Sequence, residues 1–129
     1  MPHLTARVPE ARLTGKEPAL IAALADVVVE VYGGWVRDHV AVYLDGVPGG
    51  RWGVGGEAAD HAAPAITFGI RESALARPDG KEIAARLVAG VTDAVARVLG
   101  EQVRGGTSVE LVATPEGRTG IGGALPESP

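Results

Sequence analysis

Two prolines stand at matching places in the chain, and only one of them can supply a free amine. Pro2 directly follows the first methionine, so removal of Met1 would leave its ring nitrogen as a secondary amine at the chain end. An α-amino group has an unperturbed pKa of about 7.7–8.0, and an apolar wall or a nearby arginine lowers that pKa. Such a group can remove a proton next to a carbonyl near neutral pH. Pro64 is held in a peptide bond, and its nitrogen cannot act as a base.

These prolines open two copies of one sequence pattern. A constant offset of 67 pairs residues 19–56 with residues 86–123 without a gap. Identical pairs include Arg37 with Arg104 and Gly53 with Gly120. Matched strand, helix and turn signals in the same order are harder to obtain by chance than identities in an Ala-, Gly- and Val-rich chain. The sequence therefore predicts a tandem repeat.

The first copy has the pattern of a strand, a helix and a second strand. Residues 2–8 alternate apolar and polar side chains, which is typical of a strand. Thr14 and Glu17 have capping-box spacing before a helix that we expect to run to about Tyr32, where two glycines end it. Residues 39–45 are predicted to form the second strand.

The second copy repeats this plan, with alternation over residues 65–70 and a final strand over 107–113. A helix between two strands implies a parallel, right-handed β-α-β unit. Two such units predict an α+β fold of two layers, a four-stranded mixed sheet with both helices on one face. We expect residues 1–62 and 63–125 to be two repeats of one structural domain, because a unit of about 60 residues has a marginal core alone. Residues 126–129 are predicted to be a disordered tail.

Composition excludes several classes of function. The net charge is −4 without a basic block, which argues against a nucleic-acid partner. The absence of cysteine excludes disulfides and thiolate chemistry. No run of apolar residues is long enough for a membrane span, and no leader opens the chain, so we expect a cytoplasmic protein without a membrane partner. His3, His39 and His61 lack metal-ligand spacing, and we interpret them as surface or strand residues.

Four features together resemble the tautomerase superfamily, whose fold macrophage migration inhibitory factor shares. These features are a short β-α-β unit, a proline after the first methionine, Arg12 after the first strand and the aromatic-Gly-x-Gly-Gly sequence of residues 52–56. The chain looks like a fused, tandem version of 4-oxalocrotonate tautomerase. Residues 11–14, A-R-L-T, are also similar to cis-3-chloroacrylic acid dehalogenase, and malonate semialdehyde decarboxylase is another fused relative.

This resemblance implies a proline base or acid, arginines that bind substrate carboxylates, and no cofactor and no metal. Pro2 matches the catalytic proline, and Arg12 matches the arginine that follows the first strand. Arg71 matches a carboxylate-binding arginine of the fused dehalogenase and decarboxylase. Trp52 stands where the family has a phenylalanine that walls the pocket, and it would equally suit a contact between chains. A solvated side chain is the alternative for each arginine.

The departures from the family pattern matter as well. The second-strand arginine of 4-oxalocrotonate tautomerase falls at Ala41, and at Ser108 in the repeat. The histidine of the dehalogenase falls at Val28 and its second arginine at Ala74, and no residue matches its water-activating glutamate. Efficient dehalogenation is therefore not expected.

The sequence predicts a cofactor-independent isomerase, a keto-enol tautomerase that uses Pro2 as general base on an enol or dienol 2-keto acid. A decarboxylase or hydratase of a small three-carbon acid, with protonated Pro2 as the acid, is one alternative. A non-catalytic scaffold of the same fold is the other, because part of the arginine set is missing. Single-repeat relatives assemble six units, so the resemblance also implies a homotrimer of the fused chain.

Overall fold

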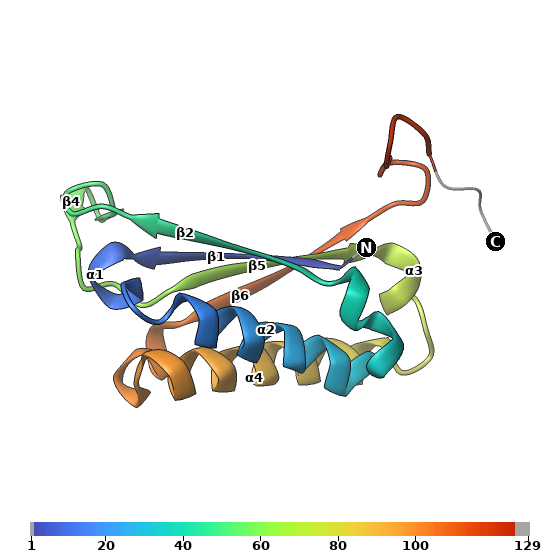
Figure 1. Ribbon diagram of the computed structural model, residues 1–129, viewed down its shortest axis with the longest axis horizontal. Coiled ribbons are helices and arrows are strands. Elements are labelled where there is room, and N and C mark those ends of the chain that lie inside the picture. The colour runs from blue at the N-terminus through green and yellow to red at the C-terminus, as the bar shows by residue number, and fades with distance from the viewer. Residues whose placement is uncertain (1, 126–129) are drawn as a thin grey trace.

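The structure is a computed structural model, and it describes residues 2–125 (Figure 1). The expected tail at residues 126–129 lies outside the described residues. The elements, in chain order, are β1 (His3–Pro9), α1 (Glu10–Leu13), α2 (Glu17–Tyr32), the 3₁₀ turn η1 (Gly34–His39), β2 (Ala41–Val47), β3 (Gly53–Val54), β4 (Glu57–Ala58), β5 (Ala65–Arg71), α3 (Glu72–Leu75), α4 (Gly80–Leu99), the 3₁₀ turn η2 (Glu101–Gly106) and β6 (Ser108–Thr114).

The main sheet has four strands in the order β2-β1-β5-β6. β1 pairs with β2 in parallel, β5 pairs with β6 in parallel, and β1 and β5 meet antiparallel in the centre. Thr5 stands opposite Thr67 at the middle of that central pair, so the two copies are related by a twofold rotation there. α2 and α4 lie side by side on one face of the sheet (Figure 1). The predicted fold class is therefore confirmed.

The two copies share one core between the sheet and the helices. The inward side chains of the central strands are almost wholly buried, and those of β1 are Leu4, Ala6 and Val8. Both long helices supply equivalent stripes, such as Leu20, Leu24 and Val28 on α2 and Leu87, Val91 and Val95 on α4, all 0% exposed. Burial of such a side chain stabilises the fold by roughly 1.5–3 kcal/mol. α2 of the first copy packs against α4 of the second, so the two copies form one continuous core.

The helix starts and the second strand differ from the prediction. The Thr14 hydroxyl donates to the carbonyl oxygen of Glu10 at 3.0 Å, because the short helix α1 comes just before it. Glu17 accepts from the Gly15 amide at 2.7 Å, and no side chain caps α2, so the predicted capping box does not form. β2 begins at Ala41 and not at residue 39, because η1 occupies Gly34–His39.

Two arms rise from opposite ends of the sheet, on the side away from the helices (Figure 1). The first is a hairpin, in which β3 pairs with β4 across Gly55 and Gly56 at φ 61° and 87°. The second is a bridge between Ile121 and Ala124. Positive φ is accessible to glycine without a steric cost, which explains the repeated glycine pair.

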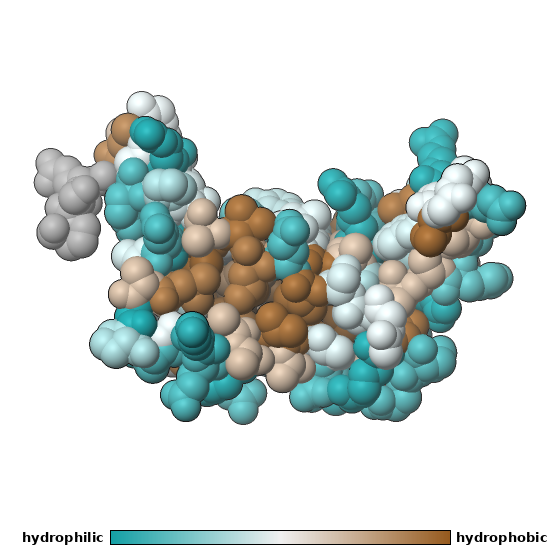
Figure 2. Space-filling model, turned by 180° about the vertical axis from the view of Figure 1, so that it is seen from behind, coloured by the Kyte–Doolittle hydropathy of each residue, from teal (hydrophilic) through white to brown (hydrophobic). Residues whose placement is uncertain are grey.

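The sheet face away from the helices and the β6 edge remain open. Arg7 and Asp45 form an exposed ion pair at 3.5 Å on this face, beside Tyr43, which is 58% exposed. Figure 2 shows apolar side chains gathered on the side of the molecule where β6 and α4 lie, where Val88 and Val112 are exposed. Among the described residues, no helix combines the length and the apolar character needed to cross a bilayer.

Candidate active site

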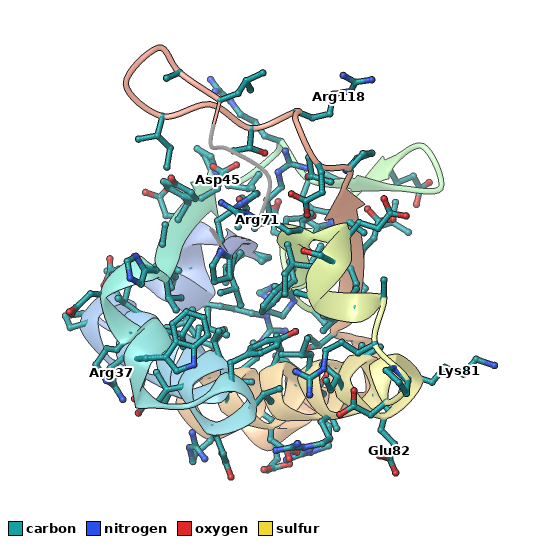
Figure 3. The ribbon with its side chains drawn as sticks, turned by 90° about the vertical axis from the view of Figure 1, so that its right-hand side faces the viewer. Arg37, Asp45, Arg71, Lys81, Glu82 and Arg118 are labelled. Atoms are coloured by element: carbon teal, nitrogen blue, oxygen red, sulfur yellow. The ribbon has the colours of Figure 1, made fainter. Side chains whose placement is uncertain are left out.

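A cavity of about 280 Å³ opens at the end of the sheet where β1 begins and β5 ends. Figure 3 looks at this end of the molecule, with Arg71 near its centre. The cavity is lined by Pro2, Tyr32, Trp35, Val36, His39, Ile70, Arg71, Ser73 and Ala74. Because β1 and β5 are antiparallel, the first residues of β1 lie beside the last residues of β5. Both copies are thus needed to form this cavity.

Pro2 is half-buried at the mouth of the parallel pair formed by β1 and β2. Its carbonyl oxygen accepts a hydrogen bond from the Ala41 amide at 3.2 Å. This bond fixes the residue at the edge of the sheet, next to the end of β5. Pro2 and Arg71 therefore both line the same cavity.

Trp35 forms an aromatic wall of the cavity, which the sequence patterns do not indicate. It stands in η1, and its indole nitrogen donates to the Tyr32 carbonyl oxygen at 2.8 Å. A Cβ at Gly33 would lie 3.2 Å from the indole, so glycine allows the ring to sit close to the chain there. The His39 ring lies 6.4 Å from the indole ring. His39 is exposed as expected, but it belongs to this turn and lines the cavity.

Tyr32 contributes a buried hydroxyl group to the same end of the fold. The hydroxyl oxygen has no hydrogen-bond partner among the described residues. Burial raises the pKa of Tyr32, and the nearby Arg77 opposes that rise only in part. The phenol therefore remains protonated at neutral pH.

Arg71 supplies a cation whose N–H groups form no ion pair with a carboxylate among residues 2–125. Four other arginines, Arg7, Arg37, Arg77 and Arg104, form ion pairs with carboxylates. Arg71 forms none with residues 2–125. A guanidinium in a largely apolar cavity can bind a carboxylate through two hydrogen bonds.

The structure does not bring Arg12 or Trp52 to the Pro2 cavity of the same chain. Arg12 lies beyond the other end of β1, where its guanidinium donates to the carbonyl oxygens of Ala62 at 3.2 Å and His61 at 2.6 Å. Trp52 lines a separate cavity with Arg7 and Arg51. The substrate-binding roles of Arg12 and Trp52 therefore remain predictions that require a neighbouring chain.

The repeat itself contained a signal for the missed residues. At the constant offset, Tyr32, Trp35 and His39 correspond to Leu99, Gln102 and Gly106. The two copies differ at these positions although both form the same helix end and 3₁₀ turn. Aromatic side chains that appear in only one copy accordingly cluster beside Pro2.

Similar folds are found among solved structures. The structure described as the F6 fused 4-OT wild-type asymmetric trimer is 24% identical, with a TM-score of 0.81 over 95% of this chain and 94% of that chain. Native fused 4-OT is 26% identical, with a TM-score of 0.80 and the same coverage. Pt0534 inactivated by 2-oxo-3-pentynoate is 22% identical, with a TM-score of 0.74 over 95% of this chain and 94% of that chain. No protein-family model matches the sequence, and no curated protein matches it.

These comparisons confirm the predicted resemblance. The chain has the fold of the fused 4-OT proteins of the tautomerase superfamily, in which two β-α-β units form one sheet. The match extends over nearly the whole chain, including both copies.

Proposed function

We propose that the protein is a cofactor-independent tautomerase that acts on an enol or dienol 2-keto acid. The observation that carries this proposal is the shared cavity of Pro2 and Arg71. With Met1 removed, the Pro2 nitrogen would take the proton from the enol oxygen and return it to carbon. Arg71 would bind the carboxylate and stabilise the charge of the intermediate enolate.

The surroundings of Pro2 favour an amine that is neutral at working pH. Apolar and aromatic residues, among them Trp35 and Ile70, line the cavity, and Arg71 adds a positive charge. Desolvation and a neighbouring cation both disfavour the protonated amine. A neutral secondary amine near pH 7 can act as a general base.

The acetylenic acid that inactivates Pt0534 offers a direct test of this site. A free secondary amine adds to the triple bond of 2-oxo-3-pentynoate, which is conjugated with the keto group, and a carboxylate is present for Arg71. We expect the intact mass of the protein to show loss of Met1 and, after incubation, one added inhibitor molecule at Pro2. Retention of Met1, or labelling elsewhere only, would contradict the assignment of Pro2.

Catalysis is tested with the Pro2→Ala variant, which keeps an amine at the chain end but changes it from secondary to primary. The rate of ketonisation of 2-hydroxymuconate and phenylenolpyruvate should fall while the circular dichroism spectrum is retained. Tautomerisation at the wild-type rate would remove Pro2 from the mechanism.

Decarboxylation or hydration of a small three-carbon acid is a second candidate, and the position of Arg71 in the cavity favours it. In that reaction a protonated Pro2 would act as the acid. The pH profile separates the two functions, because an acid is active below its pKa and a base above it. If 2-oxo-3-pentynoate modifies Pro2 but the protein turns over neither class of acid, the protein would be the non-catalytic scaffold.

We also propose that the chain assembles as a homotrimer. Fused 4-OT structures are described as symmetric and asymmetric trimers. The open edge of β6 and the exposed Val88 and Val112 provide unpaired backbone groups and apolar surface for such contacts. Light scattering of a fully active monomer would contradict this assembly.

A further inference from the structure

We infer that the Pro2 cavity selects a monocarboxylic acid whose remaining part is flat and apolar, and that Trp35 is the residue that selects it. This inference rests on the proposed function for the reaction, and it adds the chemical class of the acid. It comes from the distribution of charge and aromatic surface around the cavity.

The cavity lining offers a binding partner for one carboxylate. Arg71 is the one permanently charged side chain among the lining residues. The rest of the lining includes Trp35, Val36 and Ile70, and Val36 and Ile70 are nearly fully buried, with 3% and 5% exposed. A second carboxylate placed against these walls would lose its water without gaining a cation. The lining therefore favours an acid that carries one carboxylate and an apolar remainder.

Trp35 is placed to contact that remainder. Its hydrogen bond to the Tyr32 carbonyl and its contact with Gly33 hold the indole in place on the turn. The side chain nevertheless stays open, since the residue is 71% exposed. An exposed indole beside a small cavity can stack on a planar group of a ligand, and aromatic pairs gain stability beyond their buried area.

The second copy shows that the fold does not need this indole. Gln102 takes the place of Trp35 in η2, which forms the same 3₁₀ turn after an equivalent glycine. Gly100 and Gly33 have similar φ angles of 116° and 107°. Val103 and Val36, the next residues of the two turns, are buried alike, with 1% and 3% exposed. A structural requirement for tryptophan would apply to both copies, so its presence beside Pro2 alone indicates a role in binding.

Kinetics with two enol acids test this inference on the wild-type protein and on Trp35→Ala. Phenylenolpyruvate has one carboxylate and a flat ring, whereas 2-hydroxymuconate has two carboxylates. We expect Trp35→Ala to lower kcat/KM for phenylenolpyruvate about tenfold, and to change that for 2-hydroxymuconate less than threefold. Gln102→Ala is the matched control and should leave both values unchanged. An equal loss for both acids would overturn Trp35 as the selecting residue.

Binding of unreactive acids separates this inference from the proposed reaction. Cinnamate and fumarate are both trans-3-substituted acrylates, one with a phenyl group and the other with a second carboxylate. We expect isothermal titration to give cinnamate at least tenfold tighter binding than fumarate to the wild-type protein, and this preference should disappear in Trp35→Ala. If cinnamate binds in this way but neither enol acid is turned over, the proposed function fails while the ligand class stands.

The opposite pair of results would reject the monocarboxylate inference and keep the proposed function. If both enol acids are turned over in a Pro2-dependent way but fumarate binds more tightly than cinnamate, the tautomerase proposal stands and the monocarboxylate inference is wrong. That result would mean that the walls beside Arg71 also bind a second carboxylate.

Discussion

The carbonyl oxygens of Pro2 and Pro64 accept the same hydrogen bond in the two copies. The Ala41 amide donates to Pro2 at 3.2 Å, and the Ser108 amide donates to Pro64 at 3.1 Å. Their surroundings differ, because Pro64 is fully buried whereas Pro2 lines a cavity. The chain that leads to Pro64 also fills its neighbourhood, where a Cβ on Gly106 would lie 3.0 Å from the Ala63 side chain. One proline position has thus become an open site, and the other is closed by its own chain.

This difference predicts that Pro64 affects stability and not catalysis. Pro64→Ala removes a fixed φ angle and part of a buried ring, so we expect the free energy of unfolding to fall by about 1 kcal/mol. The kcat/KM for 2-hydroxymuconate should remain that of the wild type. Urea unfolding and steady-state kinetics measure the two quantities. A loss of activity in a folded Pro64→Ala protein would show that the buried copy also takes part in the reaction.

Arg71 is predicted to act on the substrate within its own chain. Loss of a hydrogen bond to a charged group costs roughly 1.5–3 kcal/mol. Arg71→Ala should therefore lower kcat/KM about tenfold to a hundredfold. Arg86→Ala, in which an exposed arginine of α4 is removed, is the control and should be unaffected. Wild-type kinetics in Arg71→Ala would assign Arg71 to the solvated surface.

Arg12 is predicted to act only across a chain boundary, because its guanidinium lies beside His61 and Ala62 and away from Pro2 of its own chain. Pro2→Ala and Arg12→Ala proteins should each have low activity alone. Mixing them under conditions that exchange subunits should restore part of the activity, since some pockets would combine Pro2 of one chain with Arg12 of another, and that Arg12 would join Arg71 at the same carboxylate and carbonyl oxygen. If Arg12→Ala only lowers the unfolding temperature and mixing restores no activity, the role of Arg12 is to hold the segment between the two copies in place through its hydrogen bonds to His61 and Ala62.

The sequence predicted the layers of the fold because the repeat, the alternation and the helix stripes are local patterns. Leu4, Ala6 and Val8 lie inward as their alternation requires. The site was harder to predict, because antiparallel pairing joins the start of β1 to the end of β5. Arg12 is close to Pro2 in sequence and follows the same strand, yet a strand of seven residues separates them. Arg71 is distant in sequence but lies on the same cavity.

The turn that carries Trp35 was missed for a different reason. A glycine pair after a helix signals the helix end, and it does not show that the following residues form a 3₁₀ turn over the cavity. The chain has two tryptophans, and the glycine-rich sequence around Trp52 points to that one. A comparison of the two copies at Trp35 and Gln102 would have pointed to the other one.

Acid should weaken a contact at the end of α4. Arg104 binds both carboxylate oxygens of Glu101, at 2.8 and 3.1 Å, and also contacts Asp93. The hydrogen bonds from Arg104 hold the pKa of Glu101 below its ordinary value of 4.5. A depressed folded-state pKa contributes stability above the unfolded-state pKa, and this contribution is lost as the pH falls through the folded-state value. The difference in unfolding midpoint between wild type and Glu101→Gln should therefore be present at pH 7 and should shrink as the pH falls below 4.5. A difference that does not change with pH would contradict this account.

Gly80 should control both stability and the shape of the cavity. It is buried at the start of α4, and a Cβ there would overlap the carbonyl oxygen of Leu75, the last residue of α3. Because this contact is with backbone, no side-chain rotation can relieve it, and α3 would have to move. α3 carries Ser73 and Ala74, which line the Pro2 cavity. Gly80→Ala should therefore cost about 1–3 kcal/mol of stability and lower kcat/KM. Gly105→Ala is the control, since no atom lies within 4 Å of the added Cβ. Thermal unfolding and kinetics of both variants test the prediction, and equal behaviour of the two would show that α3 is not held by this contact.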